Sequence, residues 1–143
     1  MTGLRGPCAC GSVRYRTSGA LTGPLTFCNR WRCRKRSGSS YGTTAGVAAA
    51  AFRVTDGADL LRAWESSPVV RRHFASCCGS PIFKTDEADP AELGFRLGTL
   101  DDDPGLGGGM HFQVGSAVPW LRLDDGLPCE GGGPPFGARD ADT

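Results

Sequence analysis

Seven cysteines carry most of the chemistry that this sequence could perform. Cys8 and Cys10 form a C-x-C pair near the start, and Cys77 and Cys78 are adjacent in mid-chain. Cys28 and Cys33 lie in the run 27–38, together with five cationic residues. Thiolates bind zinc, act as nucleophiles or stay buried as small apolar groups, so each cluster has three interpretations.

We expect these thiols to be reduced. The first residues contain no apolar segment of the kind that a secretion signal requires. No apolar run approaches the roughly 18 residues of a membrane helix, so we expect no membrane partner and a cytoplasmic location. In that reducing compartment, an odd number of cysteines in C-x-C and C-C clusters favours metal binding over disulfides.

The basic run beside Trp31 is the main candidate for electrostatic recognition. Sixteen Lys and Arg residues against fifteen Asp and Glu give a formal net charge of +1, so the whole-molecule field does not favour nucleic acid. Planar arginine side chains suit carboxylates and phosphates, which predicts an anionic small molecule as the partner. The expected substrate-binding residues are Trp31, Arg32, Arg34 and Arg36. The alternative is a solvated basic loop.

The elements that must position these residues are short strands. Twenty-two glycines and ten prolines argue against long helices. Val13–Thr17 alternates apolar and cationic residues, the period of a half-buried strand. Asp56–Arg62 is expected to be a turn or a short helical turn. Further strands are expected over 25–28, 40–47, 69–74, 82–84, 93–97 and 110–114.

The sequence therefore predicts a mostly β fold, a single small domain of short antiparallel strands with cysteine knuckles. We place this domain over residues 1–128. Residues 129–143 begin with the Gly/Pro-rich run Glu130–Pro135 and have the composition of a disordered tail.

Motifs spread along most of the chain point to one family. They are Cys8-Ala9-Cys10-Gly11, the run 28–38, Arg72-His73-Phe74, Cys78-Gly79-Ser80-Pro81, the run 98–102, His111, Pro119-Trp120 and the run 124–128. In this order and spacing the chain resembles the glutathione-dependent formaldehyde-activating enzyme family, which also contains the centromere protein V domain. The resemblance implies a zinc-bearing β-tent fold in a bacterial protein. For the enzyme branch it implies carbon–sulfur lyase activity on the glutathione–formaldehyde adduct.

The same resemblance implies two zinc sites, and the chain departs from the pattern at both. In the family a first C-x-C joins a later C-x-x-C in a structural site, which corresponds to Cys8, Cys10 and Cys78. A middle C-x-C-x-x-C holds a catalytic zinc, and Cys28 and Cys33 match its outer positions. The remaining cysteines of these motifs are replaced by Ala75 and Arg30, and Asn29 stands where a histidine is usual.

The structural site needs a fourth ligand, because zinc prefers a tetrahedron of thiolates or imidazoles. Cys77 is the candidate, displaced by two positions from the family's cysteine. Successive side chains of an extended strand point to opposite sides, so both thiols reach one metal only if the chain turns sharply, as Gly79 would allow. We expect at most one zinc, held by Cys8, Cys10, Cys77 and Cys78. The alternative is four reduced, partly buried thiols.

The middle site is expected to have lost its metal. Two thiolates do not hold zinc tightly, and an arginine keeps its charge and cannot act as a ligand. Cys28 and Cys33 are then inert core thiols, or the surrounding arginines stabilise one of them as a reactive thiolate. His111 is a candidate acid or base, with a structural, hydrogen-bonded histidine as the alternative. The candidate catalytic residues are thus Cys28, Arg30, Cys33 and His111.

Three functional hypotheses follow. The leading one is a divergent carbon–sulfur lyase acting on an anionic small molecule or thiol adduct, with glutathione as a possible co-substrate. The second is a repurposed enzyme that catalyses a different, biosynthetic step in the old metal pocket. The third is a non-catalytic zinc-binding or interaction domain. A homo-oligomer is compatible with all three.

Overall fold

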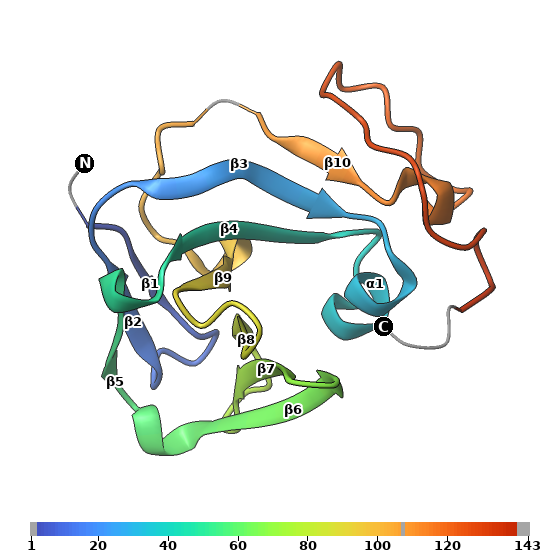
Figure 1. The fold of residues 1–143 in the computed structure, drawn as a ribbon. Helices are drawn as coiled ribbons and strands as arrows, with labels where there is room; N and C mark the ends of the chain where they lie inside the picture. The colour runs from blue at the N-terminus through green and yellow to red at the C-terminus, as the bar shows by residue number, and fades with distance from the viewer. Residues whose placement is uncertain (1–2, 107, 140–143) are drawn as a thin grey trace. The chain divides into compact units, whose positions relative to one another are not determined.

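A computed structural model describes residues 3–106 and 108–139 of the chain (Figure 1). The chain forms two compact units. The first comprises Met1–Gly23 and Ala45–Gly105, and the second comprises Pro24–Thr44 and Leu106–Thr143. Strands β3 (Leu21–Cys28) and β4 (Gly42–Ala48) each contribute residues to both units.

The first unit contains a three-stranded antiparallel sheet in the order β1, β2, β5. These strands are β1 (Arg5–Pro7), β2 (Arg14–Thr17) and β5 (Phe52–Asp56). Along β2, exposed arginines alternate with the buried Tyr15 and Thr17, as the sequence pattern predicts. The Tyr15 ring stacks on Phe52 with centroids 4.9 Å apart, which attaches the buried face of this sheet to an aromatic core.

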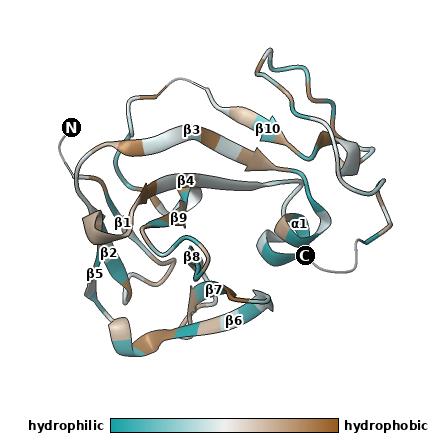
Figure 2. Cartoon of the chain, viewed as in Figure 1, coloured by the Kyte–Doolittle hydropathy of each residue, from teal (hydrophilic) through white to brown (hydrophobic). Residues whose placement is uncertain are grey.

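The same unit contains an antiparallel meander of four consecutive strands. They are β6 (Leu61–Ser67), β7 (Val70–Ala75), β8 (Pro81–Asp86) and β9 (Glu92–Arg96). Hydrophobic residues occur only near the start of β6, and the rest of the strand is pale or hydrophilic (Figure 2). The fully buried Ile82 and Phe95 come from β8 and β9 and form part of the core. Short 3₁₀ helices in this unit lie at Ala49–Ala51, Ala58–Leu60 and Leu97–Thr99.

The second unit is organised around the end of β3. Strand β10 (Met110–Phe112) pairs with β3 in parallel, with His111 opposite Phe27, and a 3₁₀ helix follows at Val114–Ser116. Helix α1 (Trp31–Ser37) begins directly after Arg30. It ends at Gly38, whose φ of 69° is left-handed and whose N–H donates to the Arg34 carbonyl over 2.8 Å. Cations in the last turn favour this end of the helix dipole.

The prediction of a small, mostly β fold with antiparallel strands and a cysteine cluster is confirmed, with β3 and β10 as a parallel exception. The expected helical turn within Asp56–Arg62 is present as Ala58–Leu60. Sequence reasoning missed α1 and β6. In both segments charged residues interrupt the apolar period, and the local backbone is set by neighbouring elements. None of the described helices is long and apolar enough to cross a membrane.

The segment after Pro128 makes specific contacts in the second unit. Cys129 forms a parallel β-bridge with His111, and the Glu130 N–H donates to the His111 carbonyl over 2.8 Å. The Ser116 hydroxyl donates to the Pro134 carbonyl. Cys129 and Glu130 thus contact β10, and Pro134 contacts the 3₁₀ helix that follows it, while residues 140–143 lie outside the described residues. The domain boundary at residue 128 stays a prediction.

Candidate functional site

Two tight turns in the first unit bring four cysteines together. The first follows β1, where the Gly11 N–H donates to the Cys8 carbonyl over 3.0 Å. The second joins β7 to β8, where the Gly79 N–H donates to the Ala75 carbonyl over 2.7 Å. Gly79 has a φ of 79°, so the sharp turn expected there is present and glycine is the residue suited to it.

The four thiol sulfurs form one compact group. Cys10 Sγ lies 3.6 Å from Cys8 Sγ and 3.2 Å from Cys77 Sγ, and all four ligand atoms lie within 4.8 Å of one another. Cys8 is buried, while Cys10, Cys77 and Cys78 are exposed. The Ala9 N–H donates to Ser80 Oγ over 2.8 Å and so ties the two turns together. Cys77 thus lies in one group with Cys8, Cys10 and Cys78.

This arrangement fits a tetrahedral metal ion. Zinc bound to four thiolates at about 2.3 Å requires sulfur–sulfur separations of about 3.8 Å, and the observed separations of 3.2 and 3.6 Å approach that value. The Val13 N–H donates to Cys8 Sγ over 3.3 Å, a contact that stabilises a thiolate. Cys8, Cys10, Cys77 and Cys78 would hold the ion and close its coordination shell, as in a structural site.

Hydrogen bonds shift the pKa values of Cys10, Cys77 and Cys78 in different directions. Ser80 donates from its hydroxyl and its amide and lowers the pKa of Cys78 to about 5. Contacts with the Ser12 side chain and amide lower the pKa of Cys10. The contact with Cys10 is the main cause that raises the pKa of Cys77 to about 12. Metal binding would therefore release a proton from Cys77.

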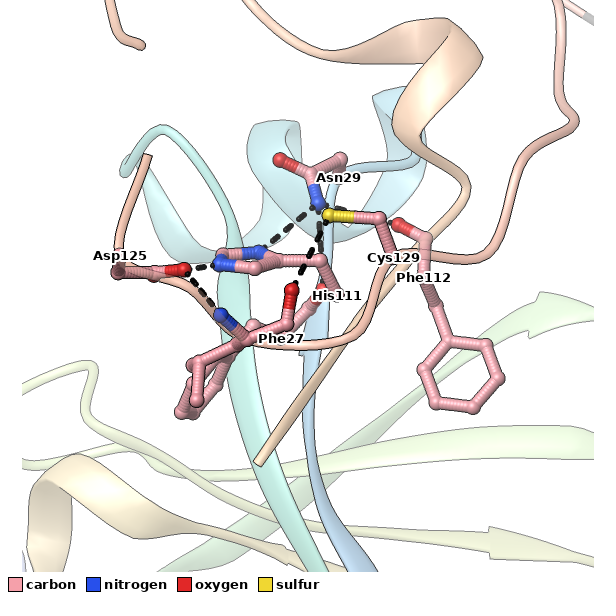
Figure 3. A network of polar contacts seen from close by, with 7 residues as sticks. Phe27, Asn29, His111, Phe112, Asp125 and Cys129 are labelled. Carbon is pink, nitrogen blue, oxygen red and sulfur yellow. Dashed lines mark hydrogen bonds and ion pairs between the residues drawn. The ribbon is translucent and has the colours of Figure 1, made fainter. Parts of the chain in front are cut away.

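A buried polar network occupies the centre of the second unit (Figure 3). Asn29 follows β3 and is 1% exposed, and His111 on β10 is 0% exposed. Asn29 Nδ2 donates to the carbonyls of Phe27 and Phe112 over 3.2 and 3.1 Å. It also lies 3.5 Å from His111 Nδ1. The amide therefore joins the parallel strands β3 and β10 at their ends.

The other ring nitrogen of His111 is also engaged. His111 Nε2 lies 2.8 Å from Asp125 Oδ2. Because the Asn29 amide is a donor facing Nδ1, the neutral imidazole carries its proton on Nε2 and donates it to Asp125. This bond is the main cause that lowers the pKa of Asp125, with a contribution from the Leu127 N–H.

Aromatic rings enclose the same imidazole. The ring centroids of Phe27 and Tyr41 lie 5.3 and 5.2 Å from that of His111, both edge-on. Enclosure on all sides keeps a substrate from reaching either nitrogen of His111 in this conformation. The arrangement supports the structural alternative for His111, while its proposed acid or base role stays a prediction.

The cations of α1 lie against aromatic rings and backbone as well as toward solvent. The Arg32 guanidinium lies 4.7 Å from the Trp31 ring, and Arg32 is buried. Arg34 Nε donates to the Asn29 carbonyl over 3.2 Å, and its guanidinium lies 4.8 Å from the Phe136 ring. These two arginines help to position the helix, so the interpretation of the whole run as a solvated basic loop does not describe them.

The sequence-predicted catalytic residues lie around the junction of β3 and α1. Cys28 ends β3, Arg30 immediately precedes α1, and Cys33 lies within α1, all three partly exposed. Among residues 3–106 and 108–139, only the cysteines of the first unit form a group of three or more side chains able to share a metal ion. In the second unit, Cys28 and Cys33 supply two thiol ligands, fewer than the four that zinc prefers.

Comparison with known proteins places the chain in a family. The sequence profile of the glutathione-dependent formaldehyde-activating enzyme matches residues 3–116, well over half of the chain. The chain belongs to this family. The chain is similar to the crystal structure of a Rhodobacter sphaeroides protein, with 24% sequence identity and a TM-score of 0.58. The match covers 72% of this chain and 90% of that chain. At that identity the likeness shows the fold alone. No curated protein matches the chain.

Sequence reasoning missed two members of the second unit's polar network in this family member, Asn29 and Asp125. The sequence predicts a turn at Asp125, and it shows Asn29 only as a replacement for the histidine that is usual at this position. The signal that could have identified them is the burial expected for His111 at the centre of an apolar strand, since a buried imidazole needs partners for both nitrogens. The sequence cannot say which of many polar residues supply them.

Proposed function

We propose that this family member is a divergent carbon–sulfur lyase that acts on an anionic small molecule or thiol adduct without a catalytic zinc. The proposal includes a bacterial, cytoplasmic setting, a structural zinc on the four cysteines of the first unit, and glutathione as co-substrate. The observation that carries it is the contrast between the two cysteine motifs. Four thiols converge in the first unit, whereas two thiols and Arg30 stand at the matching positions of the second.

Carbon–sulfur bond formation of this kind does not require a metal if another cation stabilises the negative charge that develops on oxygen. When a thiol adds to an aldehyde, a sulfur–carbon bond forms, the carbonyl double bond becomes single, and the thiol proton ends on oxygen. A fixed guanidinium can stabilise the developing oxyanion, as hydrogen-bond donors do in other enzymes. Arg30 is the candidate for that role, and Arg36 is the candidate for holding a substrate carboxylate.

A second candidate function is a non-catalytic zinc-binding or interaction domain. The specific observation in its favour is the complete burial of His111, with both ring nitrogens occupied inside the second unit. A repurposed enzyme that acts on another small molecule would have the same zinc content as the leading candidate, but would not accelerate glutathione–formaldehyde exchange.

Exchange spectroscopy with glutathione and ¹³C-formaldehyde separates these functions. We expect the purified protein to accelerate adduct formation and breakdown, and Arg30→Gln to reduce the acceleration by about tenfold or more. Arg71→Gln is the matched control, because Arg71 is an exposed arginine on β7 in the first unit. No acceleration by the wild-type protein would exclude the lyase proposal and leave the other two candidates. Equal effects of the two substitutions would exclude the role of Arg30.

A further inference from the structure

The outward face of the small sheet in the first unit carries a row of arginines. Arg5 on β1 lies opposite Arg16 on β2, and Arg16 lies opposite Arg53 on β5. All three side chains are exposed, whereas Tyr15 on the other face of β2 is buried. Neighbouring strands lie about 4.8 Å apart, so the row places three guanidinium groups within roughly 10 Å along the sheet.

Two members of this row form no ion pair within the described residues, although the charge of Arg16 helps to lower the pKa of Asp102. Arg5 is held by Asp102, with Nε and Nη2 each 3.1 Å from a carboxylate oxygen. Throughout residues 3–106 and 108–139, the Arg16 and Arg53 side chains make no hydrogen bond or ion pair. Like charges directly opposite one another on adjacent strands destabilise a sheet. An anion bound between Arg16 and Arg53 would turn that repulsion into two charge-assisted contacts.

The surface around the pair is hollowed on both sides. One hollow of about 370 Å³ is lined by Arg14, Tyr15 and Thr55 together with the arginine row. The other, of about 400 Å³, is lined by Thr17, Ser18, Ala50 and Ala51. Arg16 and Arg53 belong to both hollows. Each volume lies within the range of small-molecule sites, so there is space for a compact organic group beside the anion.

The small net charge of the side chains around the first hollow limits the size of the anion that can bind there. Four arginines line the first hollow, and Arg14 Nε is already bonded to the Gly11 carbonyl over 3.0 Å. Asp101 lines the same hollow, Asp102 binds Arg5, and Asp56 lies in register with Arg14. Four cations against three carboxylates leave a local charge of +1. That is too little for a nucleic-acid backbone, which requires an extended basic stripe.

We infer that Arg16 and Arg53 bind the phosphate group of a small phosphomonoester. A carboxylate is satisfied by one guanidinium, whereas a phosphate offers three acceptor oxygens and a charge near −2 to two adjacent ones. The organic part of the ligand lies in the hollow beside Thr17 and Ala51, where small side chains leave space. This site lies in the first unit and does not rest on the function proposed for the arginines of α1.

Titration of the ¹⁵N-labelled full chain with glycerol 3-phosphate at constant ionic strength tests the inference. We expect saturable shifts at the amides of Arg16, Thr17, Ala51 and Arg53. Arg16→Gln and Arg53→Gln should each weaken binding by about tenfold or more, since a hydrogen bond to a charged group is lost. Both side chains are exposed and unpaired within the described residues, so both variants should fold with a thermal midpoint at or above that of the wild type.

Arg71→Gln is the control and should leave the affinity unchanged, because Arg71 is exposed on β7 and faces Glu87 at 3.9 Å. Glycerate, which carries a carboxylate in place of the phosphate, should bind more weakly than glycerol 3-phosphate. The inference is overturned if no saturable shifts occur, if the Arg16 and Arg53 variants bind like the wild type, or if glycerate binds equally well. Tighter binding of a short oligothymidylate would also overturn it, in favour of nucleic acid.

Discussion

Asn29 is the residue whose replacement should reveal how the second unit is held together. Its Nδ2 donates to the Phe27 and Phe112 carbonyls over 3.2 and 3.1 Å and faces His111 Nδ1 at 3.5 Å. Asn29→Ala removes these donors without adding a new group. The two strand ends that meet at this amide, those of β3 and β10, then lose their side-chain connection.

The cost follows from which acceptors keep another partner. The Phe112 carbonyl also accepts the Asn29 backbone N–H over 2.9 Å, so it stays satisfied in the variant. The Phe27 carbonyl, which lies within the paired strand β3, loses one hydrogen bond, whereas His111 Nδ1 loses the amide that faces it. A net hydrogen bond contributes about 1 kcal/mol, and a buried polar group left without a partner costs about 1–3 kcal/mol. We expect Asn29→Ala to lower the free energy of unfolding by about 2–4 kcal/mol.

The stability of an Asn29→Asp variant should depend on pH. A carboxylate at this position would face two carbonyl oxygens in a buried site, so the folded-state pKa of Asp at position 29 should lie above its unfolded value of about 3.9. The protonated acid is then favoured in the folded state. Its contribution is fully present below the unfolded pKa and is lost as pH rises through the folded pKa.

Urea unfolding followed by tryptophan fluorescence between pH 4 and pH 8 measures both effects. Ser37→Ala is the control, because that hydroxyl makes only a long 3.4 Å bond to the Arg34 carbonyl and an exposed 3.2 Å bond from the Ser39 N–H, and should contribute little. A loss below about 0.5 kcal/mol for Asn29→Ala would refute the account of the amide as a buried junction. The same conclusion would follow if the stability gap between Asn29→Asp and the wild type failed to widen with rising pH.

Three further substitutions test other parts of the structure. Cys78→Ser should lower both the bound zinc and the thermal midpoint, because a structural metal contributes folding energy; an unchanged midpoint in a thermal scan would contradict this. Asp125→Asn should cost more stability at pH 6 than at pH 3, since the contribution of a carboxyl whose pKa is lowered by His111 is lost as pH falls through that pKa. Urea midpoints at the two pH values measure it, and a gap that does not change between them would count against the bond. Tyr15→Phe removes the 2.7 Å bond to Thr99 Oγ1 and should cost about 1 kcal/mol in chemical unfolding; no measurable loss would exclude that bond as a contributor.

The local patterns in the sequence were sufficient for the parts of the fold that they encode directly. The alternation in Val13–Thr17 corresponds to β2, and the Cys77-Cys78-Gly79 turn delivers both thiols to the C-x-C pair, as expected. These features depend on a period of two and on the backbone freedom of one glycine, and both can be read from neighbouring residues.

The parts that could not be predicted depend on residues far apart in the chain. The parallel pairing of β3 with β10 and the partners of His111 come from separate segments, and a single sequence does not show which polar side chains meet. The Arg16–Arg53 pair arises in the same way, from the register of β2 and β5. Charged residues in such a run read as a solvated face until the sheet places them side by side.

Metal content is the measurement that tests the central claim most directly. Elemental analysis of the full chain, purified without a chelator, should give one zinc per chain. The same measurement on Cys10→Ser should give substantially less, because Cys10 Sγ lies within 3.6 Å of two other ligand sulfurs. Two zinc ions per chain would contradict the interpretation of Arg30 as the residue that ends metal binding in the second unit. No zinc in the wild-type protein would contradict the four-cysteine centre itself.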